Sequence, residues 1–318
     1  MTAQEVSAFL GATDVPRDRY GRPLIKQVDG TKPTPYTRCT TFVSALEDTY
    51  NLQLWSQRMV ALGLAHRPDL LLSVSAHADD KKQLNNICSQ AREASAASSK
   101  ATIGTALHRI CERLDNGEDF AIPEVAKADV EAYQAATYDT RWTHVERITV
   151  HDGLKVAGTP DRIGRTHPDE QALVWDIKTG TLDWGMGKIA MQLALYAHSL
   201  AYNIDTGERT PLDVDLTRAI IIHLPAGEGR CDLVEVDIEA GWEAVQHAAW
   251  VRGWRARKDL SKPYTPQPLT NSADSLTRLI ENAPTLEALV ELWSSNIGRW
   301  TPGYTQIAAL RRAALTAA

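Results

Sequence analysis

Two charged residues stand at the end of an apolar run, ALVWDIKT at positions 172–179. Side chains alternate along a strand, so Asp176 and Lys178 share one face while Ile177 points the other way. Taking a carboxylate and an ammonium out of water is costly unless they have partners. An isolated Asp-x-Lys is typical of a strand-end salt bridge, so a catalytic interpretation needs further charged groups nearby.

The preceding segment, HVERITVHDGLKVAGTPDRIG, supplies such groups. It contains two alternating runs joined by Asp152-Gly153, a pair favoured in two-residue hairpin turns. In that register position 150 faces 155 and position 146 faces 159, which makes Glu146 and Asp161 diagonal neighbours on one face. Several oxygen ligands beside a lysine suit Mg²⁺ or Mn²⁺, hard cations that polarise phosphate oxygens and activate water.

At this point the residues resemble a known family. The segments GTALH (with His108), GTPDRIG, DIKTG and QLALY follow in the order and spacing of the PD-(D/E)XK nuclease superfamily, in its RecB-like branch, which includes the CRISPR-adaptation exonucleases. The resemblance covers roughly residues 100–225, and the whole chain more loosely resembles RecB-like exonucleases encoded by bacteriophages. It implies an α/β fold with a restriction-endonuclease-like core, a central mixed sheet flanked by helices.

The resemblance also implies roles for individual residues. Asp161 and Asp176 would ligate the metal together with the carbonyl of Ile177, and Lys178 would orient the attacking water and offset developing charge. His108 would complete the metal shell, and an imidazole ligand favours Mn²⁺ over Mg²⁺. Glu146 is either a further carboxylate of the metal site or an ordinary strand residue.

Polar residues on the following helix are candidates for catalysis and for DNA contacts. Gln192 and Tyr196 are four residues apart and Lys188 lies four before them, so all three follow one helical line that could face the DNA backbone. A tyrosine packed in an apolar helix with a glutamine at its rim is the structural alternative. Basic residues around the His108 helix are candidates for phosphate contacts; they are Lys81, Lys82, Arg92, Lys100, Arg109 and Arg113.

Two cofactor classes are not expected. The CRISPR-associated relatives bind an iron–sulfur cluster through one N-terminal and three C-terminal cysteines, whereas here only Cys231 follows the motifs. The four cysteines lack a CxxC pair and are interpreted as ordinary reduced residues. The segment GMGKIA (185–190) lacks the Gly-Lys-Ser/Thr of a P-loop, so no helicase motor is expected.

Composition indicates a protein without membrane spans. The chain has 34 Lys and Arg against 40 Asp and Glu, a net charge of −6, so any contact with DNA must be local. No apolar run approaches the roughly 20 residues of a membrane helix, and the N-terminus does not resemble a secretory signal. We expect a cytoplasmic location, in the host cytoplasm if the protein is encoded by a phage.

The secondary-structure pattern positions these motifs in the middle of the chain. Helices are expected at 40–72, 78–98, 103–116, 123–139, 187–203 and 241–258, and strands in the hairpin and at 172–179, 217–225 and 231–238. Three parts follow from this pattern: an irregular arm (1–36) with a helical region to residue 99, a nuclease core at 100–262, and a Pro-rich linker with a helical tail at 263–318.

One further pattern mixes aromatic and basic residues. Trp242, Trp250 and Trp254 occur together with Arg252, Arg255, Arg257 and Lys258, as in some single-strand binders, although core packing with a solvated face is the favoured interpretation. Two functions are carried forward. One is a metal-dependent DNA exonuclease of phage or bacterial replication or recombination, with a possible protein partner from those processes. The other is a non-catalytic module on a nuclease fold that binds DNA ends or a recombination partner.

Overall fold

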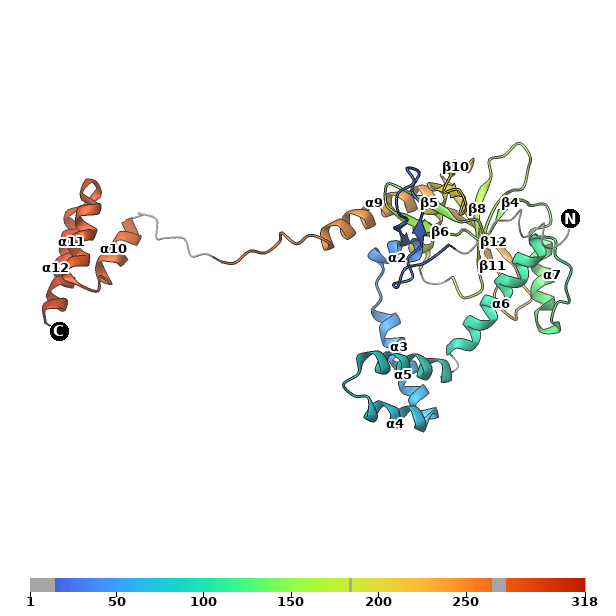
Figure 1. Cartoon of the computed structure of the whole chain (residues 1–318), viewed down its shortest axis with the longest axis horizontal. Coiled ribbons are helices and arrows are strands. Elements are labelled where there is room, and N and C mark those ends of the chain that lie inside the picture. The colour runs from blue at the N-terminus through green and yellow to red at the C-terminus, as the bar shows by residue number, and fades with distance from the viewer. Residues whose placement is uncertain (1–14, 96, 183–184, 265–272, 318) are drawn as a thin grey trace. The chain divides into compact units, whose positions relative to one another are not determined.

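The computed structural model describes residues 15–95, 97–182, 185–264 and 273–317, without the side chains of 97–102 and 273–274. The chain divides into two compact units, Met1–Ala256 and Arg257–Ala318. The first unit contains the strands (Figure 1). The motif residues also belong to it. In the described part of the chain, no helix has both the length and the apolar character that crossing a membrane requires.

The main sheet of the first unit has five strands in the order β12-β11-β8-β7-β4. Strands β8 and β11 are parallel and all other neighbours are antiparallel. The strands are β4 (Arg141–Val145), β7 (Arg162–Arg165), β8 (Leu173–Lys178), β11 (Arg218–His223) and β12 (Asp232–Asp237). Strand β8 is central and buried on both faces, which explains why its sequence is apolar up to Asp176.

A second sheet continues from the first through a shared pair of chain segments. Its order is β10-β9-β5-β6-β3, and only β3 and β6 are parallel. The strands are β3 (Thr37–Arg38), β5 (Thr149–His151), β6 (Val156–Gly158), β9 (Leu200–Tyr202) and β10 (Arg209–Pro211). The segments 141–151 and 156–165 form one long hairpin, with its outer part in this sheet and its inner part in the main sheet.

Helices cover both faces of the main sheet. On one face α8 (Met186–Ala197) and α9 (Ile238–Arg255) pack against Val174 and Ile221. On the other face α6 (Ala97–Asp115) and α7 (Lys127–Ala136), which follows η2 (Glu124–Ala126), contribute Cys111 and Tyr133 to a second core. The predicted fold class, a mixed sheet flanked by helices as in restriction-endonuclease-like proteins, is confirmed.

The helical N-terminal region contains more and shorter helices than predicted. The expected helix at 40–72 is four shorter elements, α2 (Cys39–Val43), η1 (Ser44–Leu46), α3 (Tyr50–His66) and α4 (Pro68–Ala76), and α5 (Lys81–Ala94) follows. The break after His66 has a local cause, because the proline at position 68 favours the first turn of a new helix. Helices α3 and α5 cross closely at Gly63, where an added Cβ would overlap the Ala91 backbone.

The predicted irregular arm has little regular structure where it is described, but it is packed against the rest of the unit. Residues 1–14 lie outside the described residues, but residues 15–36 pack against the second sheet and contain the strand pair β1 (Leu24–Ile25) and β2 (Thr34–Pro35). Val15, Ile25 and Tyr36 are buried there with Val150. The arm carries few apolar residues, and its order comes from these long-range contacts rather than from local periodicity.

The second unit is a small helical bundle. It contains α10 (Ala273–Glu281), α11 (Leu286–Ser295), η3 (Ile297–Arg299) and α12 (Pro302–Thr316) around a core that includes Leu276, Ile280 and Leu289. Helices α11 and α12 begin at Thr285 and Thr301, whose hydroxyls accept hydrogen bonds from backbone N–H groups of the first turn. The predicted helical tail is present, and residues 265–272 of the expected linker lie outside the described residues.

Candidate active site

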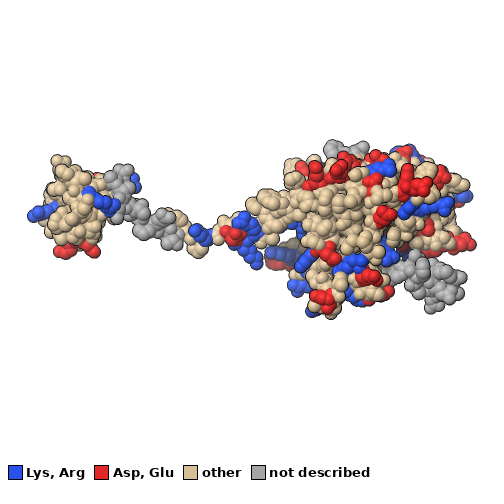
Figure 2. Space-filling model, turned by 90° about the horizontal axis from the view of Figure 1, so that it is seen from above, with Lys and Arg blue, Asp and Glu red and all other residues tan. Residues whose placement is uncertain are grey.

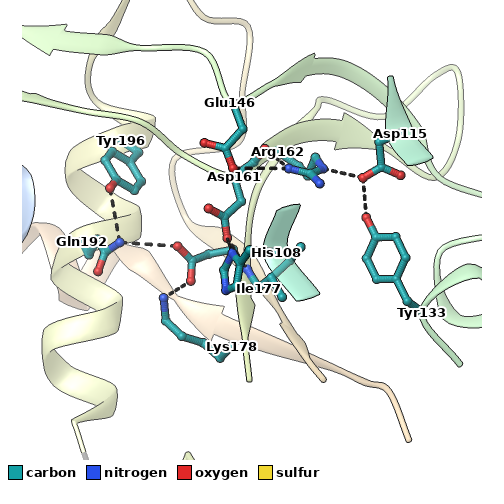
Figure 3. A network of polar contacts seen from close by, with 11 residues as sticks. His108, Asp115, Tyr133, Glu146, Asp161, Arg162, Ile177, Lys178, Gln192 and Tyr196 are labelled. Atoms are coloured by element: carbon teal, nitrogen blue, oxygen red, sulfur yellow. Dashed lines mark hydrogen bonds and ion pairs between the residues drawn. The ribbon is translucent and has the colours of Figure 1, made fainter. Parts of the chain in front are cut away.

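Two carboxylates meet where β7 begins and β8 ends. Asp161 immediately precedes β7, and Asp176 lies near the end of the antiparallel neighbour β8. Oδ2 of Asp161 accepts a hydrogen bond of 2.7 Å from the backbone N–H of Ile177 (Figure 3). The sheet register therefore brings together two residues that are fifteen positions apart in sequence, as the two motifs predict.

His108 joins this pair from helix α6. Its Nδ1 lies 3.4 Å from Oδ2 of Asp161, and the ring also hydrogen bonds to the backbone of Ile177. Helix α6 approaches the end of β8 so closely that a Cβ at Gly104 would lie 2.4 Å from Oγ1 of Thr179. A side chain at this glycine of the GTALH motif would therefore displace the Thr179 hydroxyl at the end of β8.

Asp176 is held from its other side by Lys178 and Gln192. The Lys178 ammonium forms an ion pair with Oδ2 of Asp176, and Gln192 of α8 donates to Oδ1 at 3.4 Å. The same Gln192 amide donates to the hydroxyl of Tyr196 at 3.2 Å. Tyr196 is only 4% exposed, and Gly158 of β6 packs so closely against its ring that a Cβ would lie 2.7 Å from Cε1.

Glu146 lies beside Asp161, in a register that corrects the predicted one. The loop between β5 and β6 has four residues, 152–155, instead of the expected two, so Thr149 pairs with Gly158. Glu146 is therefore directly opposite Asp161, and its N–H donates to the Asp161 carbonyl at 3.0 Å. Local sequence favours the tighter turn at Asp152-Gly153, but hydrogen bonds from Tyr36 and Arg209 hold Asp152 in the wider loop.

Burial perturbs every acid of this cluster. Desolvation and the neighbouring Asp161 charge raise the pKa of Asp176 to about 6, although Lys178 opposes the shift. Desolvation also raises the pKa of Asp161. Desolvation and repulsion from Asp161 raise the pKa of Glu146 to about 8. The pKa of His108 is lowered by burial, which favours the neutral imidazole that can bind a metal.

The chemistry of these donors fits a divalent cation. Two buried carboxylates repel each other, and a cation between them would relieve both the repulsion and the cost of desolvation. The Ile177 N–H points to Asp161, and in a strand the carbonyl of the same residue points to the same side. Among the described residues, no three His, Cys, Asp or Glu side chains already converge as a finished cage. Lys178 forms an ion pair with Asp176, and the Ile177 N–H donates a hydrogen bond to Asp161.

A buried ion pair behind the site was not anticipated from the sequence. Arg162, 0% exposed, donates from Nε to Oδ2 of Asp115 at 2.5 Å and from Nη1 to the Asp161 carbonyl at 2.6 Å. The Tyr133 hydroxyl donates to the same Asp115 oxygen at 2.5 Å. Asp115 ends the helix that carries His108, so the pair ties α6 to β7. The sequence feature that could have indicated this ion pair is the arginine in GTPDRIG, which directly follows the candidate metal ligand Asp161.

Glu112 is a second residue that the sequence interpretation missed. It follows His108 by one helical turn and lies close enough to Asp161 and Glu146 to raise their pKa values. Its Oε2 accepts a hydrogen bond of 2.7 Å from Arg109. The spacing of four residues from His108 is the signal that could have identified it.

The residues predicted to contact DNA differ in their exposure to solvent. Lys188 is paired with Glu47 at 2.9 Å and Arg109 with Glu112, and both side chains remain partly exposed. Tyr196 is buried beneath Gln192, which corrects the prediction that it faces DNA. Burial raises the pKa of Tyr196 well above its usual value, so its hydroxyl keeps its proton. The Tyr196 hydroxyl accepts a hydrogen bond from Gln192 and so helps to orient the Gln192 side chain.

The strand-end carboxylates, the lysine and the flanking helices define a restriction-endonuclease-like fold with an acidic site at its sheet edge. Residues 121–233 match the model of the PD-(D/E)XK nuclease superfamily. The matched segment contains Glu146, Asp161, Asp176, Lys178 and Gln192, whereas His108 precedes it. No curated protein matches the chain.

Proposed function

We propose that the protein is a divalent-metal-dependent deoxyribonuclease that degrades DNA from its ends. The observation that carries the proposal is the buried pair Asp161 and Asp176 with Lys178 in contact with Asp176. The superfamily match at residues 121–233 supports nuclease chemistry. The RecB-like motifs around His108 support an exonuclease acting in phage or bacterial replication or recombination, with the chemistry in residues 100–262.

We assign some residues of the site to binding the cation and Lys178 to contacts with the attacking water and the phosphate. Asp161, Asp176, the Ile177 carbonyl and His108 would hold Mg²⁺ or Mn²⁺, with Glu146 beside them. Such a cation, when bound, polarises a phosphate oxygen and lowers the pKa of a coordinated water. Lys178 can donate a hydrogen bond to the attacking water and balances the negative charge that develops at the phosphate.

Gln192 and Tyr196 act on the site through Asp176. The amide of Gln192 fixes one carboxylate oxygen, and Tyr196 fixes the amide. Because Gly158 leaves the Tyr196 ring no room to move toward β6, this chain of contacts sets the orientation of Asp176. We therefore assign both residues a positioning role.

The charge of the site argues against a module that only binds DNA. Buried carboxylates repel phosphates, so a binding surface gains nothing from Asp161 and Asp176 unless a cation occupies the space between them and the DNA. A non-catalytic module would also need no ammonium group beside the metal ligands. The binding-only function remains as an outcome of the experiment.

The test uses end-labelled linear DNA with Mn²⁺ or Mg²⁺. Asp176→Asn and Lys178→Met should each lower the cleavage rate by about 10²-fold or more, as expected when a group that stabilises the transition state is lost. Both variants should still bind DNA. The matched control is Asp139→Asn, an exposed aspartate of the same unit, which should cleave at the wild-type rate.

Four outcomes would refute parts of this proposal. Wild-type cleavage by Asp176→Asn, or full activity in excess chelator, would remove the site assignment, and binding without cleavage by the unmodified chain would support the binding-only module. Covalently closed circular DNA tests the exonuclease assignment. An exonuclease leaves the circle intact, whereas nicking or linearisation of the circle shows an endonuclease.

A further inference from the structure

Two tryptophans of α9 lie on the solvent side of the helix. Its buried stripe is Gly241, Val245 and Ala248, which pack toward α8 and the sheet. At 100° per residue, Trp250 and Trp254 point away from this stripe. Trp250 is 68% exposed and Trp254 is 48% exposed. The favoured sequence interpretation, core packing, is therefore wrong for these two residues.

Trp242, on the same helix, is a tryptophan that does pack inside the unit. Its ring stacks on His198 with centroids 3.8 Å apart and an interplanar angle of 10°, and it also lies beside His151. That tryptophan has an internal packing role. Trp250 and Trp254 have no ring partner of this kind in the described part of the chain, and contiguous exposed apolar surface often marks an interaction site.

Positive charge accompanies the exposed rings. Residues 250–264 contain five Lys or Arg (Arg252, Arg255, Arg257, Lys258 and Lys262) against one acid, Asp259, whereas the whole chain carries −6. Figure 2 shows basic and acidic side chains interspersed over the visible face of the large unit. Cations at a helix C-terminus are favourable on their own account, but the helix dipole does not explain the tryptophans.

The individual cations are not equally available. The Arg252 guanidinium lies over the Phe42 ring and hydrogen bonds to Thr37, so it serves the fold. Arg257 is paired with Asp259 at 2.7 Å. Arg255, by contrast, is exposed and directly follows Trp254, with its Cβ about 100° further around the helix. Trp250, Trp254 and Arg255 together make what we term the α9 platform.

We propose that the α9 platform binds single-stranded DNA outside the active site. Unpaired bases stack on aromatic rings without regard to sequence, and a nearby cation accompanies the phosphate backbone. This inference rests on the proposed nuclease function, which is the reason for naming DNA as the ligand. It assigns to a separate surface the DNA affinity that the acidic site cannot supply.

The experiment measures binding without cleavage, on the full-length chain. Anisotropy of a fluorescein-labelled 20-residue oligothymidylate is titrated in EDTA, in parallel with a 20-base-pair duplex. Trp250→Ala combined with Trp254→Ala should weaken binding of the single strand by about tenfold or more, since base stacking contributes on the order of 1–3 kcal/mol per base. Binding of the duplex should change by less than twofold, because its bases are already stacked.

Two controls separate stacking from structure. Trp254→Phe with Trp250→Phe keeps an aromatic face and should restore most of the affinity. Trp293→Ala removes a ring that is also 48% exposed but lies on α11, and it should leave the affinity unchanged. Arg255→Ala should weaken binding and reduce its salt dependence by about the 0.7 units of slope expected per single-strand phosphate contact.

Several results would overturn the proposal. They are an unchanged single-strand affinity in the double alanine variant, an equal loss for the duplex, or no recovery with phenylalanine. A double alanine variant that binds DNA normally but changes its oligomeric state would assign the surface to a protein partner instead. Failure of the nuclease function is separable, because the alanine variant should still cleave short oligonucleotides in Mn²⁺, while Asp176→Asn should bind the oligothymidylate normally and cleave nothing.

Discussion

The buried ion pair between Asp115 and Arg162 gives the sharpest prediction for the fold. Asp115 accepts hydrogen bonds from Arg162 and Tyr133, both at 2.5 Å, and Arg162 is completely buried. Asp115→Asn removes the carboxylate that pairs with Nε of Arg162. Glu146 lies 3.7 Å from Nη1, but its pKa of about 8 leaves it mostly protonated at neutral pH, so it compensates the guanidinium poorly. Breaking a buried pair in this way costs about 3–5 kcal/mol, because the remaining charge cannot be resolvated. Nη2 of Arg162 already has no hydrogen-bond partner among the described residues.

The expected effect is large enough for thermal denaturation. A loss of 3 kcal/mol corresponds to a decrease in Tm of roughly 6–12 °C for a unit of this size. Near-UV circular dichroism of the metal-free chain measures it. Asp232→Asn is the matched control, since Asp232 pairs with Arg230 at the surface and both side chains are half-exposed. That change should alter stability by less than about 0.5 kcal/mol.

A second variant tests the physical reason. Asp115→Leu combined with Arg162→Met removes both charges and should recover much of the stability lost in Asp115→Asn, because no charge stays buried alone. A decrease of less than about 1 kcal/mol in Asp115→Asn would refute the argument. So would a double variant less stable than the single one. Asp115→Asn should also weaken Mn²⁺ binding in calorimetry, since the pair ties the His108 helix to Asp161.

Three further predictions concern the metal site and the tail. Burial raises the pKa of Asp176 to about 6 and of Glu146 to about 8, so the metal-free fold holds protons that the unfolded chain releases. Its stability should fall as the pH rises from about 4 to 8, while Mn²⁺ affinity rises and binding releases protons, which calorimetry in two buffers measures; a flat profile contradicts the assignment. His108→Ala should raise the Mn²⁺ concentration needed for half-maximal cleavage, and an unchanged metal titration would exclude the imidazole as a ligand. A chain shortened to Tyr264 should remain soluble and cleave short oligonucleotides, because the helical bundle beyond it has its own core; a soluble but inactive product would place part of the site in the tail.

Local sequence determined the elements that carry the candidate site. The alternation in WDIK puts Asp176 and Lys178 on one face of β8, and the apolar stripe with its Asn116-Gly117 end predicts α6, where Gly117 has a φ of 72°. These features depend on periodicity and on the conformational freedom of glycine, which act within a few residues. The two motifs also predicted that Asp161 and Asp176 lie close together, at neighbouring strands.

The register and extent of several elements were decided elsewhere in the chain. The predicted helix at 187–203 ends at Ala197, because Leu200–Tyr202 pair with β5 and β10 as strand β9. Backbone pairing with distant strands outweighs a helical pattern that depends only on local spacing. In the same way, contacts of Asp152 with Tyr36 and Arg209 set the four-residue loop that places Glu146 opposite Asp161.

Only the tertiary structure could show which charged and aromatic residues are buried. Arg162 and Asp115 are forty-seven positions apart and have no shared pattern, yet they form the ion pair behind the site. Trp242 and Trp254 look alike in the sequence of α9, but one stacks on His198 and the other is exposed. Burial depends on what the rest of the chain packs against a position, and a residue's own neighbours in sequence do not contain that information.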